Sequence, residues 1–229
     1  MKRILVLAIS ALFAVSCNKN DDDDNNTPVP ATPTAKVKYT NACISTGALR
    51  AYINDTPVQG ANGLTYLASS NYINAKPATN AKHTFVLEDS NLPLAHTNSD
   101  LAANNYYTIF AAGAVTSPAA LVVQDDLAAP ATGMAKVRFI NLSPDNLNET
   151  VYVGNSKLDS NIAFKQVTPF RQVTAGTYQI IVQDPANVPS SRTLSGQALE
   201  AGKIYTLMIT GTVSGSGTTA LTLTLVNNL

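Results

Sequence analysis

The sequence has 229 residues, and its 15 Lys and Arg side chains balance its 15 Asp and Glu side chains. A neutral chain lacks the basic excess that binding to a phosphate backbone requires, so we expect no nucleic-acid partner. Only 13% of the residues are charged, while Thr, Asn, Ser and Ala are abundant. This composition is typical of a neutral extracytoplasmic β protein.

The first sixteen residues are typical of a secretory signal peptide. Lys2 and Arg3 precede an uncharged, mostly apolar run from Ile4 to Val15. This run is too short for a permanent membrane-spanning helix, which takes roughly 20 residues. A charged start, a short apolar middle and a small-residue end are the parts of a signal peptide. We therefore expect residues 1–16 to direct export.

The signal ends in Ala14-Val15-Ser16-Cys17, which resembles the lipobox of bacterial lipoproteins. The alternative is an ordinary signal peptide with a chance cysteine. The resemblance implies that Cys17 is diacylated and becomes the new N-terminus. Acyl chains contribute about 0.8 kcal/mol per buried methylene, so two or three of them hold a protein on a membrane almost permanently. A membrane is thus the first expected partner.

Residues 17–34 read as a flexible tether, because they are rich in Asn, Asp and Pro and supply almost no apolar side chains for a core. The run Asp21 to Asp24 lacks the spaced carboxylates and the turn glycine of a calcium loop, so we expect it to stay solvated. Lys19, followed by these acids, resembles the surface-export signal of Bacteroidetes lipoproteins, although Asn20 intervenes. The resemblance implies an outer-membrane lipoprotein that faces outward rather than into the periplasm.

The remainder of the chain contains an internal repeat. Segments in the first half match segments in the second half, in the same order and at nearly constant offsets of 100, 95 and 98 residues. Such order predicts two copies of one domain. The matched pairs are 35–42 with 135–142, 51–54 with 151–154, 85–89 with 180–184, and 107–109 with 205–207.

Each copy has the length and the pattern of a small β-sandwich. Tyr178, Ile180 and Val182 alternate with Gln179, Ile181 and Gln183, and Leu221, Leu223 and Leu225 alternate with threonines. This period of two is that of a strand with one buried face. The sequence predicts an all-β fold with two tandem immunoglobulin-like β-sandwich domains. We place them at residues 35–130 and 134–229, separated by a stretch of Pro, Ala, Thr and Gly.

Two tyrosines suggest the type of sandwich. Tyr205 follows Leu199 and Gly202 at fixed distances, and Tyr107 follows Leu101 and Asn104 in the first copy. This pattern resembles the tyrosine corner of immunoglobulin-like domains, in which the phenol bonds a backbone group a few residues upstream. We therefore expect Tyr107 and Tyr205 to be structural rather than ligand contacts.

The second copy resembles a known family. Ala135–Leu142 is followed by Ser143-Pro144-Asp145 and then by Val151-Tyr152-Val153-Gly154-Asn155. This order is similar to the opening of DUF 4397, a bacterial domain of unknown function. The family implies a secreted or lipid-anchored β-sandwich, often in tandem, and supplies no catalytic residues. We interpret Ser143, Pro144 and Asp145 as a structural turn, because proline presets its φ and the flanking side chains can bond backbone amides.

Groups that would indicate catalysis are missing from the sequence. The only histidines, His83 and His96, lack zinc-ligand spacing, and no nucleophile elbow or phosphate loop is present. We expect no enzyme activity, no cofactor and no metal. His83, next to Lys82, is expected to face solvent from a strand, and Cys43 is expected to be a buried, small apolar residue.

Three functional interpretations remain open. The first is a noncatalytic surface module that binds or adheres to a glycan or a protein through its loops. The second is a structural or accessory subunit of an envelope complex, joined by strand addition at a sheet edge. The third is an enzyme of unrecognised type. A contiguous exposed patch of aromatic residues, with Tyr66, Tyr72, Tyr106 and Phe170 as candidates, would favour the first. An uncovered flat edge strand would favour the second.

The lipid anchor is directly testable. Cys17→Ser removes the only thiol that could carry the acyl chains at the signal end, so the protein is expected to leave the membrane fraction for the soluble fraction. Ultracentrifugation of lysed cells followed by immunoblotting measures this. A variant that sediments with membranes as the wild type does would refute the anchor.

Overall fold

The structure, a computed structural model, describes residues 32–146 and 148–228. The regular elements there are strands apart from one short 3-10 turn, η1 (Gly217–Thr219), so the all-β prediction is confirmed. No helix in this described part is long and apolar enough to cross a membrane. The predicted signal peptide, Cys17 and tether residues 18–31 lie outside the described residues. Pro33–Leu229 forms one compact unit.

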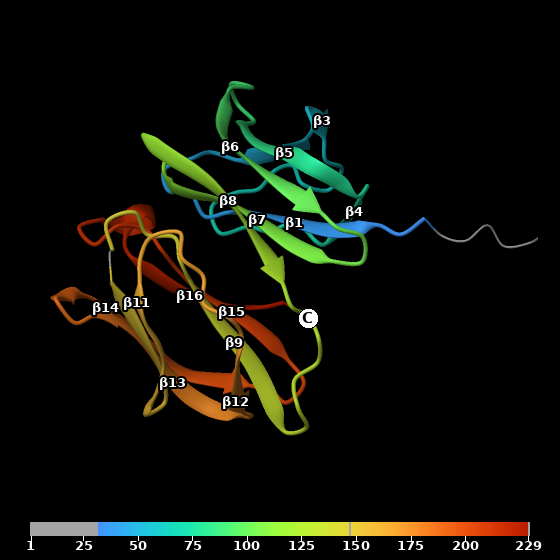
Figure 1. The fold of residues 1–229 in the computed structure, drawn as a ribbon. Coiled ribbons are helices and arrows are strands. Elements are labelled where there is room, and N and C mark those ends of the chain that lie inside the picture. Colours follow the sequence, from blue (N-terminus) through green and yellow to red (C-terminus); the bar gives the residue numbers. More distant parts are fainter. Residues whose placement is uncertain (1–31, 147, 229) are drawn as a thin grey trace, which may run out of the picture. The chain divides into compact units, whose positions relative to one another are not determined.

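The first eight strands, which we call module 1, form two four-stranded sheets (Figure 1). One sheet has the order β4-β1-β7-β8 and the other the order β3-β2-β5-β6. The strands are β1 (Ala35–Asn41), β2 (Leu49–Ile53), β3 (Thr56–Pro57), β4 (Ile73–Ala75), β5 (Ala78–Leu87), β6 (Pro93–Leu101), β7 (Tyr106–Ala114) and β8 (Ser117–Asp125).

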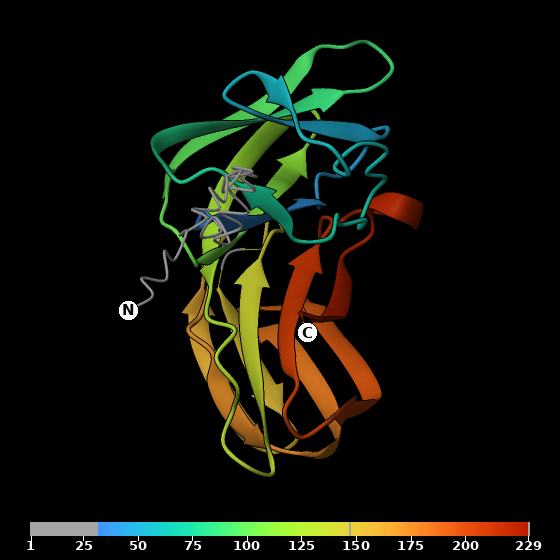
Figure 2. The same ribbon diagram turned by 90° about the vertical axis from the view of Figure 1, so that its right-hand side faces the viewer.

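The last eight strands, module 2, repeat this topology. Their sheets have the orders β12-β9-β15-β16 and β11-β10-β13-β14, and the view in Figure 2 shows these two layers facing each other. The strands are β9 (Met134–Asn141), β10 (Glu149–Val153), β11 (Ser156–Ile162), β12 (Arg171–Thr174), β13 (Gly176–Asp184), β14 (Asn187–Leu199), β15 (Ile204–Thr210) and β16 (Thr222–Asn227).

The first strand of each module pairs in parallel with the seventh. Val37 lies opposite Tyr107 in module 1, and Val137 lies opposite Tyr205 in module 2. This register reproduces the offsets of 100 and 98 residues that the sequence gives for β1 and β7. The remaining pairs within each sheet are antiparallel.

The register corrects one part of the repeat. Ala51 lies opposite Phe85, whereas Val151 lies opposite Val182. The equivalent of Phe85 is therefore Val182, at an offset of 97 residues, and not Ile180 at 95. The sequence match failed because both segments are apolar runs in which a shift of two residues keeps the same face inward.

Each module has its own hydrophobic core between its two sheets. In β1, alternate residues Ala35, Val37 and Tyr39 are fully buried, and in β13 the inward residues Ile180 and Val182 are fully buried. The expected period of two thus fills the space between the sheets. The central strands β9 and β15 depart from it, because nearly every residue in them is buried. Their outer faces must therefore be covered as well.

His83 is a correction to the sequence analysis, because it is fully buried in the core of module 1. Its Nδ1 lies 2.9 Å from the hydroxyl of Tyr39 and its Nε2 lies 3.0 Å from Oγ of Ser99. The strand registers make His83 equivalent to Ile180, and Tyr39 equivalent to Phe139. Module 1 therefore contains a polar pair where module 2 has two apolar side chains.

The polar pair can be exchanged for its counterpart in module 2. His83→Ile alone leaves the buried Tyr39 hydroxyl without a partner, which is expected to cost about 1–3 kcal/mol of unfolding free energy. Tyr39→Phe/His83→Ile removes both polar groups and is expected to be nearly neutral at pH 7.5. Urea unfolding of the wild type and both variants measures this. A double variant less stable than the single would contradict the proposed equivalence.

The same variants predict a pH dependence. Burial lowers the pKa of His83 from 6.5 to about 4, so the unfolded chain takes up this proton first as the pH falls. The folded state therefore loses the stability linked to His83 between about pH 6.5 and pH 4, and keeps it above that range. Relative to the double variant, the wild type is expected to melt at progressively lower temperature across this window. Parallel melting curves would contradict this assignment.

Candidate functional site

The two predicted corner tyrosines are held by the fold. The hydroxyl of Tyr107 accepts a hydrogen bond from the backbone N–H of Ala102, and that of Tyr205 accepts one from Glu200, each at 3.1 Å. Both rings are buried in the module cores. Each bond ties the start of a central strand to the turn before it. These phenols therefore do not face a ligand.

The Ser143-Pro144-Asp145 turn makes one contact that the sequence does not foretell. Ser143 is buried, and its N–H donates to the side chain of Asn141 at 3.0 Å. Both carboxylate oxygens of Asp145 accept from the backbone N–H of Val213 at 3.1 Å. The turn thus holds the loop that follows β15, and Asp145 is engaged within the fold.

Cys43 lies in the core of module 1 and is fully buried. Burial raises the pKa of its thiol to about 12, so the thiolate form is suppressed at neutral pH. Residues 32–146 and 148–228 contain no group of three or more His, Cys, Asp or Glu side chains placed to hold a metal ion.

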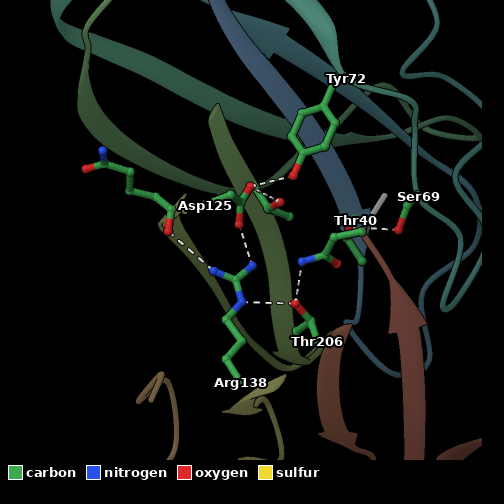
Figure 3. Close-up of polar contacts among 9 residues, drawn as sticks. Thr40, Ser69, Tyr72, Asp125, Arg138 and Thr206 are labelled. Carbon is green, nitrogen blue, oxygen red and sulfur yellow. Dashed lines mark hydrogen bonds and ion pairs between the residues drawn. The ribbon is translucent and has the colours of Figure 1, made fainter. Parts of the chain in front are cut away.

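The main polar cluster of the described chain joins the two modules, and we call it the junction (Figure 3). Arg138 of β9 forms an ion pair with Asp125 of β8, and both side chains are almost completely buried. The Nε of Arg138 donates to the hydroxyl of Thr206 at 2.9 Å, and its Nη1 donates to the carbonyl of Gln124 at 3.3 Å. These contacts distribute the guanidinium donors over both modules.

Two hydroxyl groups of module 1 supply the remaining hydrogen bonds to the carboxylate of Asp125. Its second carboxylate oxygen accepts from the hydroxyls of Tyr72, at 2.8 Å, and Thr108, at 2.7 Å. Burial and the nearby carboxylate raise the pKa of Tyr72, so the phenol stays protonated and keeps donating. Burial also lowers the pKa of Lys38, whose ammonium lies 4.3 Å from the centre of the Tyr72 ring. Each buried charge in the ion pair is therefore hydrogen-bonded, as such a pair requires.

An apolar cluster surrounds the junction. It contains Phe110 and Val123 of module 1 and Ile140, Leu142 and Met208 of module 2. Phe110, Ile140 and Met208 lie on the outer faces of β7, β9 and β15, which explains why those strands are buried on both sides. A cavity of about 20 Å³ remains here, lined by polar and apolar residues including Lys38, Thr108 and Arg138. It has room for about one water molecule, so the junction is a structural contact and not a ligand site.

Most of the aromatic residues named as candidates for an exposed patch instead make contacts at the junction between the modules. Tyr66 donates to Thr210 of module 2 at 2.9 Å, Tyr72 donates to Asp125, and Phe170 lies under the guanidinium of Arg138 at 4.6 Å. All three, like Tyr106, are only partly exposed. They therefore do not form the contiguous patch that would identify an adhesive face.

Concave sites occur elsewhere, and two of them lie at equivalent edges of the two sandwiches. In module 1, a crevice of about 350 Å³ lies between β3 and β4, and we call it crevice 1. Its walls are mainly apolar side chains, among them Val37, Ile53, Val58 and Ile73, with Asn54, Asn74 and Lys76 also in its lining. Its size is at the lower end of the range of small-ligand sites.

Module 2 has a corresponding crevice of about 380 Å³ between β11 and β12, which we call crevice 2. The registers place Val37 and Val137, Pro57 and Lys157, and Ile73 and Arg171 at equivalent positions. The two crevices thus arise from the same gap between edge strands. Crevice 2 is more polar, because Lys157, Arg171, Gln172 and Tyr178 contribute to its lining.

Comparison with known proteins identifies a family for both modules. The model of a domain of unknown function, DUF4397, matches residues 35–149 and 143–228. The resemblance seen in the second copy is therefore confirmed, and it extends to the first copy, where the sequence alone offered only the internal repeat. None of the curated proteins compared with the chain matches it.

Two crystal structures share weak similarity with the chain. A proposed cell adhesion protein of Bacteroides uniformis is 10% identical, with a TM-score of 0.25, over 86% of this chain and 99% of that one. A second proposed cell adhesion protein, of Bacteroides fragilis, is 10% identical, with a TM-score of 0.21, over 81% of this chain and 85% of that one. A likeness of this size carries no argument about activity.

The junction can be tested with two adjacent aspartates. Asp125→Asn removes the charge that compensates the buried Arg138, and we expect a loss of about 3 kcal/mol or more in unfolding free energy. Asp126→Asn is the matched control, because Asp126 pairs with Lys136 at 2.8 Å while its own side chain is 63% exposed, and we expect a loss below about 1 kcal/mol. Urea unfolding measures both. Equal losses would show that the buried pair does not stabilise the junction.

Proposed function

The chain belongs to the DUF4397 family, and from that premise we propose that it is a noncatalytic envelope lipoprotein that binds a glycan or protein ligand at the cell surface. The observation that carries the proposal is the pair of equivalent crevices, one at the same edge of each module. A concave site with apolar walls and a few polar groups is the usual form of a binding site. Two such sites on one compact unit suit the capture of an extended or repetitive ligand.

The strands that border the crevices favour recognition by side chains. Three of the four bordering strands, β3, β4 and β12, have two, three and four residues. Strand addition needs a long unpaired edge, and short edge strands are a common way to prevent it. At this edge of each sandwich we therefore favour a ligand held in the crevices over a subunit joined by strand pairing.

The surroundings of the Ser99–His83 pair support a noncatalytic role. A serine hydrogen-bonded to a histidine is the arrangement of an activated nucleophile. Here, however, the histidine is enclosed in the core, and its other nitrogen is hydrogen-bonded to Tyr39. A substrate could not reach it without opening the sandwich.

The lipid anchor and the outward orientation rest on the N-terminal sequence. Cys17 at the end of the signal peptide supplies the attachment, and residues 18–34 supply the length that separates the modules from the bilayer. Extended chain reaches at most about 3.5 Å per residue, so this segment lets the crevices face away from the membrane.

A binding screen with crevice-blocking variants tests the proposed function. Gln59→Trp and Ser156→Trp add a bulky side chain at exposed positions, the first in the lining of crevice 1 and the second in that of crevice 2. The full-length protein in detergent is screened against immobilised glycans and matrix proteins. We expect at least one ligand, whose binding falls about tenfold or more in one variant, as expected when a good contact worth about 1.4 kcal/mol is lost.

Thr193→Trp is the matched control for this screen. Thr193 is exposed on β14, at the opposite edge of the sheet from β11, so its substitution should leave binding unchanged. If no ligand is found, or if the three variants bind as the wild type does, a binding role for the crevices is refuted.

A further inference from the structure

We infer that crevice 2 binds an anionic saccharide, with a sugar ring against Tyr178 and its acidic group between Lys157 and Arg171. This inference rests on the proposed function and narrows it to one ligand class at one of the two crevices. Three observations carry it: the seating of the Tyr178 ring, the charges of the lining, and the comparison with crevice 1.

The Tyr178 ring lies against glycine backbone. A Cβ built on Gly154 would lie 3.2 Å from one edge of the ring, and a Cβ built on Gly176 would lie 3.3 Å from the other. The phenol donates to the carbonyl of Thr174 at 2.8 Å, which fixes the ring in its plane. An aromatic ring supported in this way is a flat, rigid surface in the lining of crevice 2. The C–H face of a pyranose ring is the complementary shape.

Two cations flank this surface. Arg171 is half exposed, and its Nη2 donates a long hydrogen bond of 3.4 Å to the carboxylate of Asp159, which lies outside the lining of crevice 2. Lys157 is exposed, and the described residues include no acidic partner within ion-pair distance of it. Crevice 2 has no Asp or Glu in its lining. The lining therefore favours a carboxylate or sulfate, which Arg and Lys bind by charge-assisted hydrogen bonds.

Crevice 1 shows that the fold does not require these residues. Counting along the equivalent strands, Ala81 stands where module 2 has Tyr178, Pro57 where it has Lys157, and Ile73 where it has Arg171. At these three positions module 1 thus has small or apolar side chains, although the same gap between strands is present. The Tyr178 ring also packs against the core of module 2, but the two cations beside it have no packing role, and the three side chains occur together in module 2 and not in module 1.

An acidic peptide is the competing ligand. It would also satisfy Lys157 and Arg171, but an extended peptide gains most of its affinity from backbone pairing. Of the two edge strands at crevice 2, β12 has only four residues, and β11, with seven, pairs irregularly with β10, which makes it a poor template for strand addition. The hydroxyl and amide groups of Ser156, Gln172 and Thr174 around the ring instead match a ligand rich in hydroxyl groups. The structure therefore favours the saccharide.

The test compares a negatively charged oligosaccharide with its uncharged methyl ester. Isothermal titration calorimetry with the full-length protein in detergent compares tetragalacturonate with its methyl ester, which has the same rings without the charge. We expect tetragalacturonate to bind at least about tenfold more tightly than the ester. Lys157→Gln and Arg171→Gln should each remove about tenfold of this preference, whereas Lys165→Gln, an exposed cation outside crevice 2, should remove none.

The aromatic surface is tested separately. Tyr178→Ala should abolish binding of both sugars, whereas Tyr178→Phe keeps the ring and should retain binding within about threefold, because it loses only one hydrogen bond to Thr174. Thermal melting of each variant shows whether it is folded. If Tyr178→Ala unfolds the module, Tyr178→Leu, which keeps apolar volume without a flat face, takes its place.

The outcomes separate the inference from the proposed function. Equal binding of the acid and the ester, or no binding of either, overturns the anionic saccharide. A polyglutamate peptide that binds and is lost in Arg171→Gln would assign the site to acidic peptides instead. If tetragalacturonate fails but the Ser156→Trp variant still loses a ligand found in the screen, the proposed function stands and only this inference fails.

Discussion

The buried ion pair between Arg138 and Asp125 is the contact on which the arrangement of this chain depends. A guanidinium in an apolar environment is tolerated only when its charge and its donors are satisfied, and here the partners come from both modules. The surrounding apolar cluster supplies the hydrophobic contribution, which has no direction of its own. The ion pair restricts the relative orientation of the two modules, because only one placement of β8 against β9 brings Asp125 and Arg138 together. The junction therefore specifies how two similar sandwiches meet.

The sequence predicted the parts of the fold that follow from local pattern. The period of two in β13 and β16 and the repeat of β1 and β7 required only the alternation of apolar residues and the order of segments. Long-range pairing was harder. The β5 match was placed two residues away from its true position, because apolar runs preserve the inward face under such a shift. His83 was expected in solvent, because the sequence does not show that Tyr39, 44 residues away, would hydrogen-bond it in the core.

The candidate sites were less predictable than the fold. A crevice forms where two edge strands separate, and no local pattern encodes the gap between Pro57 and Ile73, or between Lys157 and Arg171. The junction did leave a trace. Lys136 and Arg138 alternate with Val137 and Phe139 in a strand that the repeat places at the centre of its sheet. Alternating charges alone would indicate a solvated outer face, but Ile140, on the same face as Arg138, is apolar, and an apolar outer face on a central strand indicates that the face is covered once the sheet order is known.

Duplication gives this chain an internal reference for separating fold from function. Positions that are alike in both modules, such as Tyr107 and Tyr205, make the same bond in each and describe what the sandwich needs. Positions that differ divide into two kinds. In the first kind, which we call a closed exchange, the new polar groups bond each other. Tyr39 and His83, which replace Phe139 and Ile180, are such a pair. Lys157, Arg171 and Tyr178 are an open exchange, because among the described residues Lys157 has no acidic partner and Arg171 has Asp159 alone, at 3.4 Å. A bound anion would complete this exchange, which is why crevice 2, rather than crevice 1, is the place where binding should be sought.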